Sequence, residues 1–504
     1  MKHIISLSIA FLAAAAASTA MAQAPQREVV ILHTNDTHSQ IDPDRHKGKG
    51  GVLRRKALVD SVRQAVPATI VVDAGDAVQG TLYYTLFGGE VEQQMLNDIG
   101  YDIQIMGNHE FDNGMEAMAR NYSRAQATLL SANTTFDGTP LEGMLQPYVV
   151  KEAGGRRIGF IGININPEGL ISPQKSQGVV YHDAVEVIDS LARKLRAENA
   201  VDAVVVVSHI GYSGDNSTTG YTDIDLAARC PDIDVIIGGH SHTSLTPDDP
   251  RTRIVQADGD TVLVVQNGKG GNYVGEVVLA FDDAGHVHPS WRRHAVDARY
   301  DRTVDPAMAA SLEPYREKVD SVYSIKVTDV PAPFDASAMG NFAADFVRAR
   351  GSELPGVGHV DFAIMNKGGI RQQFEKGPLT RGNIIDVFPF DNRVVVLDIK
   401  GDSLATLFDT FAKQGGQCVS YNVTALMNTG RTGCSWVSID GKDIDPQRTY
   451  RVATIDYLAE GGDNMHELRS GRLVAKSPNV LYDDIIAALQ SRKTLTPDST
   501  QRMK

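Results

Sequence analysis

Between residues 28 and 280 the chain repeats one pattern, in which a short run of aliphatic and β-branched residues ends in Gly, Asn, Asp or His. The runs are VVIL, ATIVVDAGD, IQIMGNHE, RIGFIGIN, DAVVVVSHIG, IDVIIGGHSH and TVLVVQNGKGG. Continuous apolar runs, rather than alternating ones, are typical of strands buried on both faces, and intervening segments such as 183–198 have a helical pattern. The pattern predicts a layered α/β domain over residues 27–300.

A charged segment of helical character, DPAMAASLEPYREKVDSVY at 305–323, separates this domain from a second set of elements. We predict a linker helix within residues 301–325. From 326 to 504 the pattern mixes helical and strand segments with Gly-rich turns, as in MGNFAADFVRAR, NRVVVLDIKG and YRVATIDYLAEGGDN. This part predicts a smaller, separate mixed α+β domain.

The start of the chain has the pattern of an export signal. Lys2 and His3 precede a short apolar region that ends in Ala20-Met21-Ala22, the small-x-small pattern of a signal-peptidase site. The apolar region is short and rich in Ala compared with the roughly 20 residues that a membrane span needs. We predict a cleaved signal peptide at residues 1–22, no membrane span, and a soluble product in a bacterial periplasm or outside the cell.

Composition and charge narrow the classes of partner. The chain has 504 residues, 42% of them apolar and 22% charged, which is typical of globular domains. Its formal net charge is -13, and no dense Lys/Arg run supplies the positive surface that a nucleic-acid duplex requires. An acidic surface also repels anionic substrates, so phosphate chemistry would need a strong local positive charge such as a metal cluster.

Three cysteines remain in the predicted product. Cys418 and Cys434 enclose a loop rich in Gly and polar residues. In an oxidising compartment these two residues could form a disulfide or remain free thiols, and the sequence leaves both alternatives open. Cys230, beside Pro231, is predicted to be a buried thiol.

Side chains of metal-binding type stand at the ends of the apolar runs of the first domain. They are Asp36, His38, Asp76, Asn108, His109, His209, His240 and His242. Ligands in open α/β sheets gather at the carboxyl ends of strands, so residues scattered along the chain converge there if their strands are neighbours. Two divalent ions about 3.5 to 4 Å apart need a bridging carboxylate with imidazole and oxygen ligands around them. Asp76 is the natural bridge.

The motifs themselves resemble a known family. The ordered set Asp36-Thr37-His38, Gly75-Asp76, Gly107-Asn108-His109-Glu110, His209 and Gly239-His240-Ser241-His242 resembles that of the calcineurin-like metallophosphoesterases. In the second domain MGNFAADFVR, NKGGIR, VFPFDN and YLAEGGDN resemble the C-terminal domain of the 5'-nucleotidase family. The resemblance implies a β-sandwich flanked by helices for the first domain.

The resemblance also implies two sets of metal ligands. One ion would be held by Asp36, His38, Asp76 and His242, and the other by Asp76, Asn108, His209 and His240, with zinc or manganese as the metals. Family members often have an amide where this chain has His242. Because imidazole is a good ligand for both metals, we expect the metal preference to shift rather than binding to fail.

Two further residues are implied to act on the reacting group. His109 would lie next to the phosphate and protonate or stabilise the departing oxygen, while Asp112 would orient its imidazole.

The substrate residues come from the second domain. The resemblance implies that Asn366, Gly368, Gly369 and Arg371 bind the nucleotide, that Phe390 and Tyr457 stack the base, and that Asp463 contacts the ribose. Stacking favours broad tolerance among bases. Two features depart from the family: Lys367 replaces a glycine, and VPAPFDASAMGN lacks an arginine that is often found before MGN. Because metal and substrate residues lie in different domains, the site is expected at the domain interface, and the resemblance implies rotation between open and closed states.

The function that this pattern indicates is a secreted phosphohydrolase of nucleoside 5'-monophosphates, with nucleotide sugars or other nucleotides as further substrates. A 2',3'-cyclic nucleotide phosphodiesterase with 3'-nucleotidase activity is built from the same motifs and remains an alternative. A thiosulfohydrolase and a non-catalytic surface binding protein are more distant alternatives.

Overall fold

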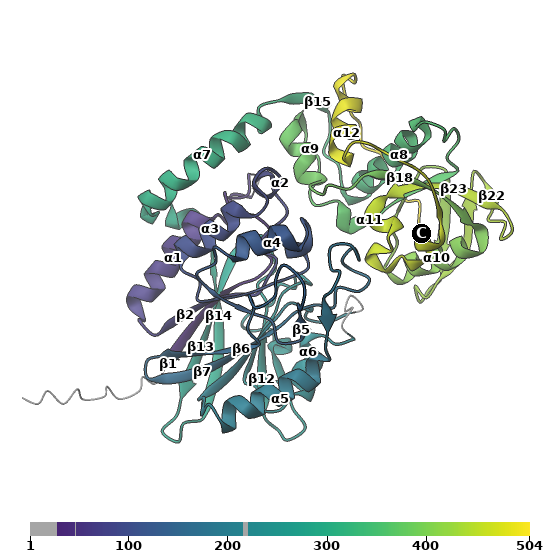
Figure 1. Ribbon diagram of the computed structural model, residues 1–504. Helices are drawn as coiled ribbons and strands as arrows, with labels where there is room; N and C mark the ends of the chain where they lie inside the picture. Colours follow the sequence, from purple (N-terminus) through teal and green to yellow (C-terminus); the bar gives the residue numbers. More distant parts are fainter. Residues whose placement is uncertain (1–27, 46, 215–219) are drawn as a thin grey trace, which may run out of the picture.

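The computed structural model describes residues 28–45, 47–214 and 220–504. The predicted signal peptide at 1–22 lies outside these residues. The chain forms a larger N-terminal domain and a smaller C-terminal domain, and the long helix α7 (Pro306–Tyr323) joins them (Figure 1). The layered α/β domain followed by a linker helix and a mixed α+β domain, as predicted from the sequence pattern, is confirmed.

Two six-stranded sheets form the centre of the first domain, and β5 (Thr134–Thr135) pairs with β8 (Val180–Tyr181) in a small separate sheet. In spatial order the first contains β14 (Val287–Ala295), β13 (Tyr273–Phe281), β1 (Glu28–Thr34), β2 (Thr69–Asp73), β3 (Ile103–Ile105) and β4 (Thr128–Leu130). The second contains β11 (Arg253–Val255), β12 (Thr261–Val265), β10 (Val235–Ile237), β9 (Ala203–Ser208), β7 (Arg156–Ile163) and β6 (Tyr148–Ala153). The central strands of each sheet run parallel, while β13, β14, β11 and β6 add antiparallel edges.

The continuous apolar runs are explained by burial on both faces of these strands. In β1, Val29 and Ile31 face the core between the two sheets, whereas Val30 and Leu32 face the helices on the outer side. Successive side chains of a strand point to opposite faces, so both faces need apolar residues when both are covered. The first sheet is therefore sandwiched between the second sheet and a layer of helices.

The helices of the first domain are α1 (Val52–Ala65), α2 (Leu82–Phe87), α3 (Glu90–Ile99), α4 (Met115–Tyr122), α5 (Ala184–Ala197) and α6 (Asp223–Arg229). The side chain of Asp183 caps α5 by accepting from the amides of Val185 and Glu186, which fixes the start of the helix predicted at 183–198.

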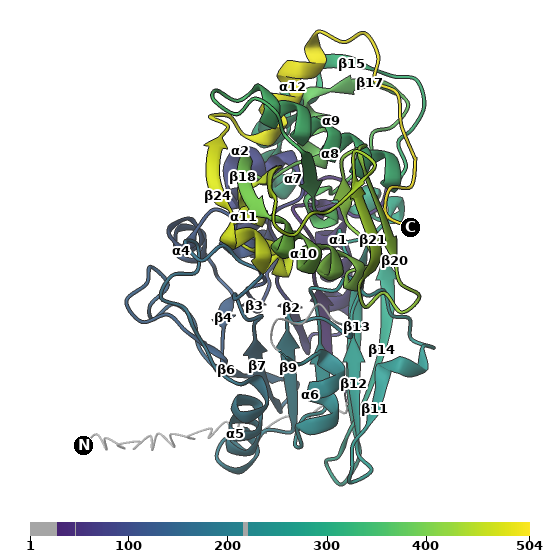
Figure 2. The same cartoon turned by 90° about the vertical axis from the view of Figure 1, so that its right-hand side faces the viewer.

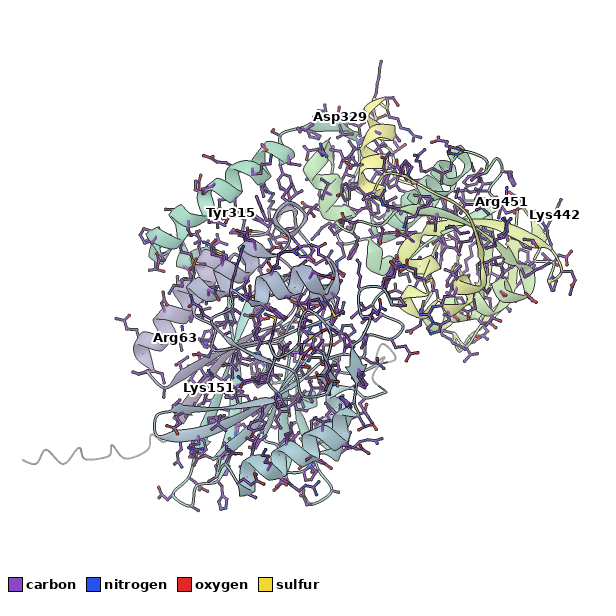
Figure 3. The ribbon with its side chains drawn as sticks, viewed as in Figure 1. Arg63, Lys151, Tyr315, Asp329, Lys442 and Arg451 are labelled. Carbon is purple, nitrogen blue, oxygen red and sulfur yellow. The ribbon has the colours of Figure 1, made fainter. Side chains whose placement is uncertain are left out.

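Helix α7 is anchored on the first domain before it reaches the second. It contacts α2 and α3 on one side and α9 (Arg381–Val387) on the other. Tyr315, labelled on α7 in Figure 3, packs edge-on against Phe87 with ring centroids 4.9 Å apart. The helix thus contributes to the interface as well as linking the domains.

The second domain is built on a five-stranded sheet in the order β19 (Cys418–Val419), β16 (Phe362–Met365), β23 (Thr449–Ile455), β18 (Val394–Lys400) and β24 (Arg472–Lys476). Smaller sheets pair β15 (Lys326–Val330) with β17 (Gly377–Thr380), and join β20 (Val423–Met427), β21 (Cys434–Ile439) and β22 (Lys442–Asp443). Its other helices are α8 (Ala336–Glu353), α10 (Gly401–Lys413), α11 (Asp456–Ala459) and α12 (Leu481–Gln490).

Cys230, Cys418 and Cys434 are all free thiols, and Cys230 is buried as predicted. In the described residues, no helix combines the length and apolar character that crossing a bilayer requires.

Candidate active site

The side chains of metal-binding type that follow the apolar runs of the sequence lie on loops at the carboxyl ends of five strands. β1, β2 and β3 are parallel neighbours in the first sheet, and β9 and β10 are parallel neighbours in the second. Their loops carry Asp36 and His38, Asp76, Asn108 and His109, His209, and His240 and His242. These strand ends lie on the side of the first domain that faces the second (Figure 2). Two sheets therefore supply one site.

Most of these loop residues adopt a backbone conformation that L side chains rarely take. Positive φ angles are found at Asp36 (49°), His38 (48°), Asp76 (54°), His240 (72°) and His242 (54°). Such residues cost free energy and persist where the surrounding structure over-determines them, commonly at functional sites. Here the amides of Asp36 and His38 donate to the carbonyls of Gly75 and Asp76, each at 3.0 Å, which locks two of the loops together.

The first cluster of potential ligands is Asp36, His38 and His242, whose ligand atoms lie within 4.8 Å of one another. The Nε2 atoms of His38 and His242 are 2.8 Å apart, and Nε2 of His242 is 3.4 Å from Asp36 Oδ1. The Asp36 carboxylate is fully buried and also accepts from the His240 amide at 3.1 Å. One carboxylate and two imidazoles thus face a common point.

A second cluster shares Asp36 with the first. It joins Asp36, Asp76 and His209, again within 4.8 Å. Nε2 of His209 lies 3.2 Å from Asp76 Oδ2, and Nδ1 of His240 lies 2.9 Å from Asn108 Oδ1. Gly107 permits this packing, since a Cβ there would come within 2.2 Å of Asp76 Oδ1.

These residues fit a pair of divalent ions. Nδ1 of His209 is 2.7 Å from the carbonyl of Ala74, which places a proton on Nδ1 and a lone pair on Nε2. Nε2 is buried and lies 3.2 Å from Asp76 Oδ2, but the two atoms are not aligned as a regular hydrogen bond. Burial alone would lower the pKa of His209, but the Asp76 carboxylate raises it to about 10. A cation between these two groups satisfies both, and the imidazole and carboxylate donors suit zinc or manganese.

His109 and Asp112 form a pair beside the clusters. Nδ1 of His109 lies 2.9 Å from Asp112 Oδ2, and the His109 amide donates to Asp76 Oδ1 at 3.0 Å. Burial opposes a charge on His109, yet the carboxylates of Asp112 and Asp76 raise its pKa above the ordinary value. The His109 ring lies 5.4 Å from the His38 ring, so a group bound at the clusters is within its reach.

Sequence reasoning missed Glu110, which organises the same loops. Its buried carboxylate accepts from the amides of Gly107 (2.6 Å), Asp76 (3.2 Å) and Ala77 (3.0 Å). Burial raises its pKa to about 7. Its place directly after His109 was the available signal, but its contacts with the loop after β2 depend on the fold.

The second domain brings Arg371 and Phe390 to the first-domain residues. Nη2 of Arg371 is 3.3 Å from His38 Nε2, and the Phe390 ring centroid is 5.9 Å from the His109 ring centroid and from Arg371 Cζ. Arg371 and His38, which are 333 positions apart in the chain, therefore share one site.

Asn366, Tyr457 and Asp463 form a hydrogen-bonded group behind these residues. Asn366 Nδ2 donates to Asp463 Oδ2 at 2.6 Å, and the Tyr457 hydroxyl lies 2.7 Å from Asp463 Oδ1. The same hydroxyl lies 3.1 Å from the carbonyl of Leu170 in the first domain. This group thus contacts both domains.

Gly368 lies in the 3-10 turn Lys367–Gly369 and is close to Asp463. A Cβ atom at position 368 would lie 3.6 Å from Asp463 Oδ2. Lys367 is exposed, and its Nζ donates to the Gly415 carbonyl at 2.9 Å. It does not take the role of a cation at the clusters.

A cleft of about 880 Å³ opens between the domains and reaches the site. His38 and Lys269 of the first domain and Arg371 of the second are among its lining residues. Phe390, Tyr457 and Asp463 are not among its lining residues, so these side chains lie away from the open cleft.

Comparison with known proteins agrees with both halves of this architecture. Residues 29–244 match the family model of the calcineurin-like phosphoesterases, and residues 321–469 match that of the 5'-nucleotidase C-terminal domain. The chain belongs to the 5'-nucleotidase family. It is accordingly a hydrolase with a metallophosphoesterase domain.

Relatives of this family member span almost its whole length. Human 5'-nucleotidase is 26% identical over 95% of this chain and 91% of its own. The 5'-nucleotidase precursor from Thermus thermophilus has a TM-score of 0.85 at 27% identity, covering 95% of this chain and 99% of that one. The trifunctional nucleotide phosphoesterase YfkN from Bacillus subtilis is 27% identical over 86% of this chain, which spans only 32% of that longer protein.

The T. thermophilus sulfate thiohydrolase SoxB has a TM-score of 0.75 at 17% identity, which shows a shared fold alone.

Proposed function

We propose that the chain is an exported, dinuclear-metal phosphohydrolase that removes the 5'-phosphate from nucleoside monophosphates. One observation supports this proposal above all. At the domain interface, Arg371 and Phe390 of the second domain lie next to the carboxylate and imidazole clusters of the first. One side of that meeting point suits a phosphate, and the other suits a flat nucleobase.

The residues that would hold the ions follow from the two clusters. Asp36, His38 and His242 converge for one ion, and Asp76 with His209 for the other. Asp76 is placed to serve both, since it also lies near His38 in a third group with His109. Asn108 and His240, in mutual contact, complete the second set.

When bound, such a pair of ions supplies the positive charge that neutralises the phosphate and lowers the pKa of the attacking water. The protein's own contribution to the reaction is at His109. With its Nδ1 held by Asp112, the imidazole presents Nε2 to the departing 5'-oxygen and donates a proton to it. Asp112 keeps that tautomer and ring orientation, and its charge stabilises the protonated form.

Binding of the nucleoside falls to the second domain. The Arg371 guanidinium, 3.3 Å from His38 Nε2, would bind phosphate oxygens, for which a guanidinium suits bidentate contacts. Asp463, held by Asn366 and Tyr457, would accept hydrogen bonds from ribose hydroxyls. Phe390 and the Tyr457 ring stack the base, which gives affinity without reading base identity.

Metal reconstitution tests this proposal. The purified chain is stripped with a chelator and titrated with zinc or manganese while metal content, thermal stability and phosphate release from AMP are followed. We expect two ions per chain, activity that rises with the second ion, and a stabilisation of about 2.7 kcal/mol at 100 times the dissociation constant. Full activity in the stripped chain, or in a chain with one ion, would contradict a dinuclear site.

A further inference from the structure

A short glycine-rich turn places Lys269 at the edge of the site. On one side of Lys269 the carbonyl of Gly268 accepts from Asn35 Nδ2 at 2.8 Å, and on the other the amide of Gly270 donates to the Asp36 carbonyl at 2.7 Å. Gly268 and Gly270 have φ angles of 76° and 72°, which favour glycine. The backbone of Lys269 is thereby fixed against the loop that carries the potential ligand Asp36.

The Lys269 ammonium lies within electrostatic reach of Arg371, of the Asp36 carboxylate and of Lys47. Within the described part of the chain, no carboxylate lies within ion-pair distance of its Nζ, although Asp36 is near enough to act on it electrostatically. Partial withdrawal from water and the charges of Arg371 and Lys47 lower the pKa of Lys269. Like charges gathered in this way repel one another unless an anion lies between them.

Arg371 is in the same situation. Its guanidinium is close to the ring nitrogens of His38, at 3.3 and 3.5 Å, and no carboxylate of the described residues lies within ion-pair distance. Burial lowers the pKa of Arg371. Lys269 and Arg371 both line the cleft beside His38, one from each domain. Although the protein has a net charge of -13, two cations without a carboxylate partner among the described residues thus lie at the open side of its potential metal clusters.

We propose that Lys269 is a further substrate-binding residue, which holds the dianionic phosphate group from the cleft side while Arg371 holds it from the second domain. This inference rests on the proposed function for the identity of the substrate. Lysine acts here as a point charge on a flexible stem, which tolerates the shift of a phosphate as its ester bond breaks. Lys367 does not share this role, because its Nζ donates to the Gly415 carbonyl instead.

The first test measures phosphate binding without catalysis. Inorganic phosphate is titrated by calorimetry into the metal-loaded chain and into Lys269→Gln, Lys269→Arg and Lys49→Gln. Lys49 is a matched control because it carries the same charge in the same domain but lies over the Tyr273 ring and outside the cleft. We expect Lys269→Gln to weaken phosphate binding about tenfold, or about 1.4 kcal/mol, a moderate value because the Lys269 side chain is exposed to solvent.

Lys269→Arg should restore the affinity to within about threefold, since a guanidinium also binds phosphate, and Lys49→Gln should match the wild type. A purely structural role of Lys269 would instead lower the melting temperature and leave the phosphate affinity of the folded fraction unchanged. An unchanged phosphate affinity in Lys269→Gln overturns the inference.

The second test separates this inference from the proposed function. Steady-state kinetics with AMP should show a KM about tenfold higher in Lys269→Gln with kcat within about threefold of the wild type. If the wild type binds phosphate through Lys269 but does not hydrolyse AMP, the proposed function fails and the phosphate contact stands. If AMP is hydrolysed and KM is the same in Lys269→Gln and the wild type, the proposed function stands and the role of Lys269 fails.

Discussion

The Nε2 atoms of His38 and His242 face each other across 2.8 Å, with their ring planes perpendicular. Two imidazole nitrogens reach this separation either by sharing one proton or by directing both lone pairs at one cation. The nearby Asp36 carboxylate, 3.4 Å from His242 Nε2, favours the cation. We therefore propose that His38 and His242 bind the same ion.

This placement predicts the behaviour of two substitutions at position 242. His242→Gln keeps an oxygen ligand and should retain two ions, with activity within about tenfold of the wild type and a changed ratio of zinc to manganese activation. His242→Ala should lose one ion. Elemental analysis together with phosphate release checks both variants, and two tightly held ions in His242→Ala would exclude His242 as a ligand.

A second prediction concerns His109 and Asp112. His109→Ala should lower kcat for AMP by about 10² to 10⁴ because it removes the proton donor, while metal content stays at the wild-type value. Asp112→Asn keeps the size of the side chain but loses the charge that orients the imidazole, so a loss of about 10- to 100-fold is expected. His288→Ala, on the exposed edge strand β14, serves as the control and should behave as the wild type. Activity that survives in His109→Ala would place the proton donor elsewhere.

A third prediction concerns Phe390, whose ring lies 5.9 Å from that of His109. Phe390→Ala removes a stacking partner worth about 1 to 3 kcal/mol, so KM should rise by roughly 5- to 150-fold for AMP, GMP and UMP alike. Phe390→Tyr keeps the ring and should preserve KM. A loss confined to one base would show that Phe390 reads base identity rather than stacking.

A fourth prediction isolates the Tyr457 hydroxyl from its ring. Tyr457→Phe removes the contacts with Asp463 and with the Leu170 carbonyl but keeps the aromatic face. The Asp463 carboxylate then loses a donor that holds it in place, and KM for AMP should rise about two- to tenfold, as expected for about 0.5 to 1.5 kcal/mol, with kcat little changed. Tyr421→Phe, at an exposed tyrosine of the second domain, is the matched control. Unchanged KM in Tyr457→Phe would contradict the role of the hydroxyl in positioning Asp463.

The layered fold and the gathering of Asp36, Asp76 and His209 could be predicted from sequence because both follow from one local signal. Apolar runs that are continuous rather than alternating mark strands covered on both faces, and polar residues at their carboxyl ends share an edge of the sheet. The left-handed backbone of Asp36 and Asp76 was not predictable in this way, since it arises from hydrogen bonds between loops.

Contacts between distant segments account for what the sequence pattern could not show. The role of Glu110 as acceptor for the Asp76 and Ala77 amides depends on how the loops after β2 and β3 pack. The approach of Arg371 to His38 depends on the relative position of two domains. The direction of Lys367 toward Gly415 likewise depends on a neighbouring loop. No periodicity or spacing in the sequence indicates these contacts.

The position of the phosphate that is removed tests the central claim most directly. Phosphate release from AMP, 3'-AMP, 2',3'-cyclic AMP and UDP-glucose is compared at equal concentrations with the metal-loaded chain, and His109→Ala is run beside it. The account predicts that kcat/KM is highest for AMP and that this activity is lost in His109→Ala. Faster turnover of 3'-AMP or 2',3'-cyclic AMP than of AMP would contradict it and assign the site to the cyclic phosphodiesterase and 3'-nucleotidase alternative.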